Sequence, residues 1–265
     1  MSNERRVIVR ADAGALANSV AERLIKKTVE LIDDFDEATI SLTGGSMGIA
    51  VLVAIRNSSA RDRVDWSRVN LWWSDERWLP HGDAERNETA ARAALLDHVP
   101  LDPQRVHPFA ASDAGLSLDE AAEAYAADLA EHGASGSELP HFDIMLLGMG
   151  PDGHIASLFP ERAGVREAVR KVIAVTNSPK PPPERLSLTL PVINSSARVW
   201  LVIAGVDKAS ALGLTLADAS VNEVPAAGVL GRRKTLFFVD ASAAAEVPEN
   251  LIDPGKFWTG SHDKS

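Results

Sequence analysis

Cysteine is absent from the 265-residue sequence. Its absence excludes disulfide bonds, thiolate metal sites and a cysteine nucleophile, and it fits a reducing compartment. Long hydrophobic runs are also missing, because no apolar stretch approaches the roughly 20 residues that span a bilayer. The N-terminal segment MSNERRVIVRADAG carries charges but lacks the apolar core of a signal peptide. We therefore expect a cytoplasmic protein with no membrane partner.

Positive charge is in short supply, with 27 Lys and Arg against 37 Asp and Glu, a net charge of −10 and an isoelectric point near 5.2. This balance argues against a nucleic-acid partner, which requires a basic face. An anionic small molecule would need a local cluster of Arg and Lys. The seven histidines show no ligand spacing such as H-E-x-x-H, so we expect neither a metal nor another cofactor. No obligate protein partner is apparent.

Short β-rich apolar runs alternate with longer amphipathic stretches along the chain. The expected strands are Val7–Val9, Thr39–Leu42, Val69–Trp73, Phe142–Leu147, Val172–Val175, Val199–Ala204 and Thr235–Val239. The expected helices are Ala15–Ile32, Met47–Arg56, Glu88–His98, Leu118–His132 and Lys208–Ala217. This order predicts an α/β fold with a Rossmann-like, mostly parallel sheet and helices on both faces. With 45% hydrophobic residues, the chain fits one catalytic domain over residues 1–252 and a flexible tail over residues 253–265.

A glycine-rich loop follows the second expected strand. Gly44, Gly45 and Ser46 lie between that strand and a helix, where converging backbone N–H groups and the positive end of the helix dipole suit a phosphate. A tight turn in which Ser46 merely caps the helix explains the loop equally well.

A charged loop follows the third expected strand. Asp75, Glu76 and Arg77 stand between tryptophans, so Arg77 is placed to bind an anion and Asp75 to touch a substrate. A structural ion pair is the alternative. Downstream, Asn87 precedes Glu88 and is interpreted as a helix cap rather than a ligand.

The loop after the fourth expected strand is the most informative. Asp152 and His154 lie two residues apart in G-M-G-P-D-G-H, at the carboxyl edge of a sheet, where α/β folds bind ligands. A histidine there can act as a general base near neutral pH, with the carboxylate orienting it or touching the substrate. The alternative is a histidine that only hydrogen-bonds its own loop.

The same loop also satisfies the dinucleotide pattern G-x-G-x-x-G through Gly148, Gly150 and Gly153. Asp152 would place a negative charge beside the pyrophosphate, and the next expected strand is not followed by the acid that would bind ribose. We therefore disfavour a nucleotide site.

Cations gather in the last third of the chain. Arg185 opens an apolar run, and Lys208 lies close to an expected helix start, where the dipole disfavours a lysine unless a phosphate is bound. Lys180 lies in a Pro-rich loop and is either a ligand or a solvated charge.

In this order the motifs closely resemble those of the 6-phosphogluconolactonases of the pentose phosphate pathway, which are related in fold to glucosamine-6-phosphate deaminases. The matching segments are S-L-T-G-G-S (residues 41–46), W-S-D-E-R (73–77), L-G-M-G-P-D-G-H-I-A-S-L-F-P (147–160), P-P-E-R-L-S-L-T (182–189) and G-V-D-K (205–208). The resemblance implies that the substrate is a phosphorylated sugar lactone, 6-phosphogluconolactone. It implies that His154 is the base, that Arg77 assists with the substrate, and that Gly44, Gly45, Ser46, Arg185 and Lys208 hold the phosphate.

Two other functions are open to the same fold. The deaminases share the Gly-rich loop and the Asp-Gly-His triplet, but they usually carry Tyr in place of Arg77 and a Glu where this chain has Phe159. A sugar-phosphate-sensing regulator would need a DNA-binding module, and we expect none because neither end shows a basic helix-turn-helix pattern. We therefore expect hydrolysis, in which His154 activates water and Asp75 and Asp152 orient the base or bind sugar hydroxyls.

Overall fold

The computed structural model describes residues 5–248 and 251–252, so the tail predicted for residues 253–265 lies outside the described residues. Six parallel strands form the main sheet in the order β1-β9-β8-β5-β2-β3. Their bounds are β1 (Arg5–Arg10), β9 (Lys234–Asp240), β8 (Arg198–Ile203), β5 (Ile144–Leu147), β2 (Ala38–Leu42) and β3 (Val69–Trp73). The predicted α/β fold class with a mostly parallel sheet is confirmed.

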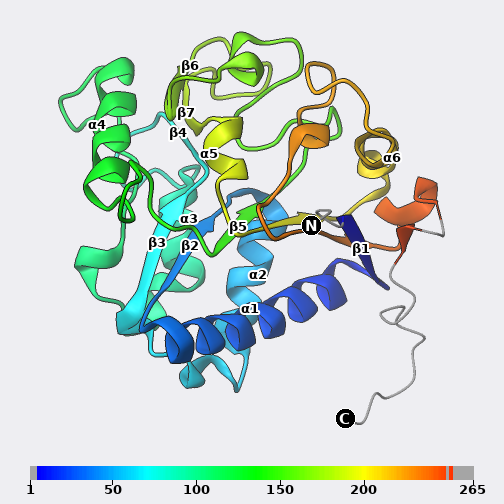
Figure 1. The fold of residues 1–265 in the computed structure, drawn as a ribbon, viewed down its shortest axis with the longest axis horizontal. Coiled ribbons are helices and arrows are strands. Elements are labelled where there is room, and N and C mark those ends of the chain that lie inside the picture. The colour runs from blue at the N-terminus through cyan, green and yellow to red at the C-terminus, as the bar shows by residue number, and fades with distance from the viewer. Residues whose placement is uncertain (1–4, 249–250, 253–265) are drawn as a thin grey trace.

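Helices cover both sides of this sheet. The α-helices are α1 (Ala13–Phe35), α2 (Gly45–Asn57), α3 (Asn87–Ala94), α4 (Leu118–Glu131), α5 (Leu190–Asn194) and α6 (Ala209–Leu216). Short 3₁₀ turns are η1 (Arg61–Arg63), η2 (Trp66–Arg68), η3 (Leu96–His98), η4 (Pro103–Arg105), η5 (Ala163–Arg166), η6 (Val206–Lys208), η7 (Pro225–Gly228) and η8 (Ala243–Glu246). Figure 1 shows α1 and α2 on one side of the sheet, with α5 and α6 on the other.

Burial and capping explain why these elements form. All residues of β2 and β5 are buried, as expected for central parallel strands that are covered on both faces. Asp12 caps the start of α1 by accepting the N–H of Ala15, and the left-handed Asp36 ends it. Ser117 and Glu120 form a capping box at the start of α4.

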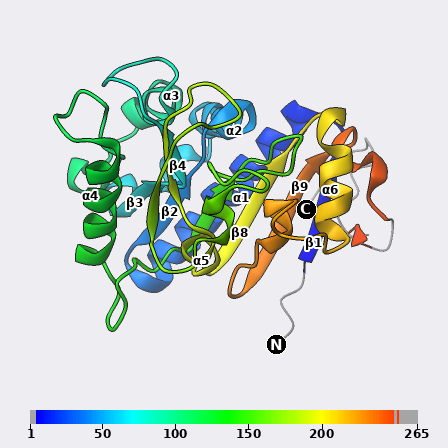
Figure 2. The same cartoon turned by 90° about the horizontal axis from the view of Figure 1, so that it is seen from above.

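A second, three-stranded antiparallel sheet lies above the carboxyl side of the main sheet, in the order β4 (Asp75–Arg77), β7 (Arg185–Leu188) and β6 (Val172–Val175). Figure 2 shows it between α4 and the long strand β8. The run Val172–Val175 is a strand as predicted, but it pairs here and not in the parallel sheet. The register of β4 with β7 places Arg77 opposite Arg185.

Among the residues that the structure describes, no helix combines the length and the apolar character needed to cross a membrane.

Candidate active site

A hollow of about 310 Å³ lies at the carboxyl edge of the parallel sheet. The loops after β2, β3 and β5 contribute to its wall, together with β7 and the turn before α6. It collects residues that are far apart in the chain: Gly44, Gly45, Ser46, Asp75, Arg77, His154, Lys180, Arg185 and Lys208. Of the predicted catalytic and phosphate-binding residues, Asp152 is the one that does not line this hollow, and its carboxylate contacts His154 instead.

The Gly-rich loop presents the N-terminus of α2 to the hollow. Gly44 is the N-cap, no side chain caps this helix, and Gly45 has a left-handed φ of 76°. A side chain on Gly44 would overlap the amide of Asn87. The alternative in which Ser46 caps the helix is therefore wrong, and the first N–H groups of α2 line the hollow without a side-chain cap.

Cationic side chains converge on the same hollow. Arg77 and Arg185 face each other across the β4–β7 pair, where like charges destabilise a sheet unless an anion lies between them. Burial lowers the pKa of Arg185, and the charge of Arg77 lowers it further, against the opposing effect of Asp75. Lys208 immediately precedes α6, and its Nζ lies 2.7 Å from Asp207. In a chain of net charge −10, this concentration of cations indicates an anion site.

His154 lies at the edge of this cluster and is held by Asp152. Its Nδ1 is 2.5 Å from Asp152 Oδ1, and Lys180 Nζ lies 3.3 Å from the same nitrogen. Burial raises the pKa of Asp152, but the hydrogen bond and charge of His154 and the charge of Lys180 outweigh it, so the pKa lies well below its ordinary value. An ionised carboxylate only accepts hydrogen bonds, so Nδ1 of His154 carries a proton, and in the neutral form of the imidazole Nε2 has the free lone pair.

Two neighbours set the position of the imidazole ring. A side chain on Gly150 would overlap the His154 ring, so only glycine allows the ring to approach Asp152 as it does. The centroid of the Phe159 ring lies 4.6 Å from that of His154, and the guanidinium carbon of Arg185 lies over the Phe159 ring, 5.7 Å from its centroid. Phe159 is 1% exposed, so this side of the histidine is apolar and dry.

The loop after β5 does not lead into a helix. Beyond Gly153 the chain forms turns up to the 3₁₀ segment η5, and it then enters β6. A dinucleotide fingerprint needs a helix that begins at this loop to bind the pyrophosphate. The geometry therefore agrees with the rejection of a nucleotide site.

Asp75 and Asn87 form the floor of the hollow. Asp75 is 7% exposed, and its Oδ2 accepts a hydrogen bond from Ser157 at 2.8 Å. The interpretation of Asn87 as a helix cap is wrong, because the N-cap of α3 is Arg86 and the Asn87 side chain donates to the Asp75 carbonyl at 2.9 Å. The sequence does not distinguish a helix cap from a residue that lines the hollow, because in both cases a small polar residue lies at the start of a helix.

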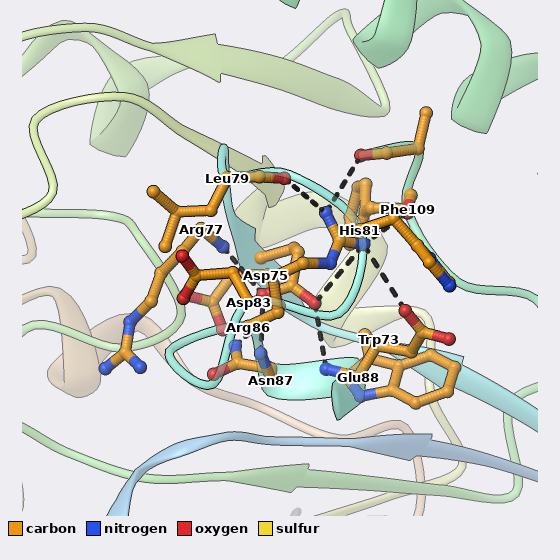
Figure 3. A network of polar contacts seen from close by, with 12 residues as sticks. Trp73, Asp75, Arg77, Leu79, His81, Asp83, Arg86, Asn87, Glu88 and Phe109 are labelled. Atoms are coloured by element: carbon orange, nitrogen blue, oxygen red, sulfur yellow. Dashed lines mark hydrogen bonds and ion pairs between the residues drawn. The ribbon is translucent and has the colours of Figure 1, made fainter. Parts of the chain in front are cut away.

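A buried ionic network behind the hollow holds β4 against the start of α3. The Glu76 carboxylate accepts the N–H groups of Arg77, Asn87 and Glu88 at 2.7–2.9 Å. Figure 3 shows Arg86 surrounded by the groups that it contacts. The Arg86 guanidinium donates hydrogen bonds to the Phe109 carbonyl at 2.8 Å and to the Leu79 carbonyl at 3.1 Å. Sequence reasoning missed the part of Arg86 in this network, because in the sequence Arg86 looks like one more surface charge.

Glu76 makes the stability of the chain depend on pH. Burial raises its pKa from 4.5 to about 7, against the lowering effects of Arg86 and the three N–H donors. Between these two values the folded chain keeps a proton that the unfolded chain releases, so the free energy of unfolding falls as pH rises. At about 1.4 kcal/mol per pKa unit, the fall is about 3 kcal/mol.

Glu76→Gln cannot titrate, so its unfolding free energy should change less than that of the wild type over this window. Urea unfolding of both chains at intervals from pH 4.5 to pH 8 measures the two slopes. Equal slopes would show that Glu76 does not keep its proton in the folded chain.

A family model described as "Glucosamine-6-phosphate isomerases/6-phosphogluconolactonase" matches residues 11–238. The chain belongs to this family. Within this family, the chain is 50% identical over 258 residues to the 6-phosphogluconolactonase of Streptomyces coelicolor. The matched region covers 96% of this chain and 99% of that relative. The chain is also 46% identical over 239 residues to the 6-phosphogluconolactonase of Mycobacterium tuberculosis, and this match covers 89% of this chain and 96% of that relative.

Solved structures of the glucosamine-6-phosphate isomerase/6-phosphogluconolactonase family share the fold. The 6-phosphogluconolactonase of Thermotoga maritima superposes with a TM-score of 0.78 at 26% identity, covering 89% of this chain and 100% of that one. A monomeric glucosamine-6-phosphate deaminase superposes with a TM-score of 0.74 at 20% identity, covering 91% of this chain and 99% of that one. At this level of identity the likeness shows the fold alone. The resemblance drawn from the motifs is confirmed, and because this fold serves both activities, the site residues must distinguish them.

Proposed function

We propose that the chain hydrolyses 6-phosphoglucono-1,5-lactone to 6-phosphogluconate. The observation that carries the proposal is the position of His154, with its Nδ1 bound to Asp152 and its ring on the wall of a hollow that also holds four cationic side chains. A base and an anion site in one hollow suit a substrate with a reactive carbonyl at one end and a phosphate at the other. The identity to named 6-phosphogluconolactonases supports the same reaction.

The phosphate binds between the N-terminus of α2 and the cations Arg185 and Lys208. Helix N–H groups and the dipole attract the anion, and Arg185 offers a planar fork of donors to its oxygens. Arg77, opposite Arg185, closes the site from the β4 side. Binding energy from this remote group holds the lactone ring in place, which converts binding into orientation at the carbonyl.

His154 then acts on a water molecule at the lactone carbonyl. Nε2 takes a proton from the water as its oxygen attacks, forming a tetrahedral intermediate, and the imidazolium returns a proton to the ring oxygen as the C–O bond breaks. The ionised Asp152 stabilises the transient imidazolium through Nδ1. Loop N–H groups or Arg77 meet the charge that develops on the carbonyl oxygen. No covalent enzyme intermediate is required.

Phe159 favours hydrolysis over deamination. A deaminase needs a second carboxylate that works with the histidine in opening the sugar ring, and Phe159 occupies that place with a buried apolar ring. A lactone arrives with an electrophilic carbonyl and needs no such relay. We further propose that the enzyme acts in the cytoplasm on this small substrate, without nucleic acid, membrane or an obligate protein partner.

A substrate comparison tests the proposal. The rate of acid release is measured on 6-phosphogluconolactone and on unphosphorylated gluconolactone, and ammonia release is measured on glucosamine 6-phosphate. We expect fast hydrolysis of the phosphorylated lactone, a far lower kcat/KM without the phosphate, and no ammonia. Ammonia release without lactone hydrolysis would contradict the proposal.

Lys208→Gln should weaken phosphate binding without removing the chemistry. Hydrogen bonds to charged groups contribute about 1.5–3 kcal/mol, so KM should rise about tenfold or more while kcat falls little. The matched control is Lys26→Gln, at an exposed position on α1 far from the hollow. Steady-state kinetics on both variants measure the split, and a loss confined to kcat would place Lys208 at the carbonyl instead.

A further inference from the structure

A second hollow lies at the opposite, amino-terminal edge of the parallel sheet. It measures about 740 Å³, and its wall includes Thr39, Asn70 and Asp143 near the starts of β2, β3 and β5. It shares no lining residue with the active-site hollow. The proposed hydrolysis uses none of its side chains.

His107 and His132 line this hollow, and Asp128 lies beside both of them. The ligand atoms of His107, Asp128 and His132 all lie within 4.8 Å of one another. His107 Nδ1 is 3.2 Å from Asp128 Oδ2, and His132 Nδ1 is 3.0 Å from Asp128 Oδ1. In a tetrahedral zinc site with bonds of about 2.0–2.1 Å, neighbouring donors lie about 3.3 Å apart. The two histidine–carboxylate distances are therefore within a few tenths of an ångström of this spacing, and the three ligand atoms together lie close enough for small side-chain rotations to bring them around one ion.

His107 is fixed before any ion arrives. Its ring stacks on Trp72 with centroids 3.9 Å apart and planes 5° from parallel. Its backbone N–H donates to the Leu71 carbonyl at 2.8 Å, and its carbonyl accepts the Tyr125 hydroxyl at 3.2 Å. A ligand locked by its packing loses little entropy on binding, which favours affinity.

The other two ligands are adjustable and face solvent. Asp128 and His132 lie one turn apart at the C-terminal end of α4, with 32% and 42% of their side chains exposed, against 7% for His107. Small rotations can therefore adapt them, and water has access to a fourth position. The C-terminal end of a helix carries the negative end of its dipole, which also favours a cation there.

We propose that His107, Asp128 and His132 bind one Zn²⁺ ion, with a water molecule as the fourth ligand. Two imidazole nitrogens and one carboxylate suit zinc, whereas Mg²⁺ and Ca²⁺ prefer oxygen ligands. The ion links the end of α4 to the segment beside β3, and Figure 1 and Figure 2 both place these elements next to each other. It stabilises the fold and takes no part in lactone hydrolysis.

Calorimetric titration of the chelator-treated full-length chain with zinc chloride tests the site. We expect one saturable ion per chain, with affinity at least about tenfold weaker in Asp128→Asn and in His132→Gln. His98→Gln, at an exposed histidine outside the cluster, should bind zinc like the wild type. His154→Asn should do the same, since the site is separate from the active-site histidine.

Thermal unfolding gives an independent readout. Zinc should raise the Tm of the wild type in proportion to its binding, and it should not raise that of Asp128→Asn. Without zinc, Asp128→Asn should hydrolyse the lactone at the wild-type rate. The proposal is overturned if no saturable binding is found, if Asp128→Asn binds zinc as tightly as the wild type, or if His154→Asn abolishes the binding.

Discussion

His154→Ala is expected to lower kcat for 6-phosphogluconolactone by about 10²- to 10⁴-fold, the range typical of a lost general base. KM should change little, because the cations that hold the phosphate stay in place. The reason is the hydrogen bond from His154 Nδ1 to Asp152, which leaves Nε2 as the acceptor for the proton of the attacking water. Initial rates at several substrate concentrations, corrected for spontaneous opening, measure both constants.

Added imidazole separates a chemical role of His154 from a structural one. The variant leaves a gap beside Phe159, and free imidazole should restore part of the lost rate if only the base is missing. His98→Ala, at an exposed histidine outside both hollows, is the matched control and should retain full activity. A His154→Ala enzyme with near-normal kcat would remove this residue from the mechanism.

Gly150→Ala is expected to lower kcat about 100-fold, the effect of displacing a catalytic group by about 1 Å. The new methyl group would overlap the His154 ring and crowd Asp152, so the ring has to move off its position. Gly150 does not have a left-handed φ, so its backbone accepts alanine and the fold should survive. Steady-state kinetics together with a thermal unfolding curve distinguish displacement of the base from loss of structure.

Gly213→Ala is the matched control for this change. Gly213 lies in α6, and a methyl group there would meet Glu246 only at ordinary contact distance, 3.7 Å. Its kcat should equal that of the wild type. Normal activity in Gly150→Ala would mean that the observed closeness of His154 and Asp152 is not needed for the reaction.

Much of the fold follows from local sequence patterns, because hydrophobic period and turn residues act over short stretches. The run Val69–Trp73 was predicted with the bounds that β3 has, and α4 differs from its predicted range by one residue. The same reasoning failed for Val172–Val175, where the strand is correct but its partners are not. Pairing depends on which distant segment is available, and the composition of a short strand does not record that choice.

In the candidate site, too, local motifs predict which residues take part, whereas the pairing of distant segments is not predicted. Loop position and residue type were enough to select Gly44, Arg77 and His154, and the fold brings them to one hollow. The antiparallel pairing that sets Arg77 against Arg185 depends on β4, a strand of three residues with no apolar pattern. Sequence patterns alone do not predict such a strand.

Asp128 and His132 illustrate a signal that the sequence holds but does not complete. A carboxylate and an imidazole four residues apart at a helix end can bind one ion, yet two groups alone do not define a site, and the sequence alone therefore predicts no metal. His107 joins them only because the chain after η4 returns beside β3. The fold, and not the spacing in the sequence, therefore brings the third ligand to the site.

The most direct test of the central claim is the rate of opening of freshly generated 6-phosphogluconolactone, followed by proton release with wild type, with His154→Ala and without enzyme. The account predicts that the wild type opens the lactone far faster than the spontaneous reaction and that His154→Ala falls back close to that background. A wild type that does not exceed the background, or a variant that matches the wild type, would contradict it.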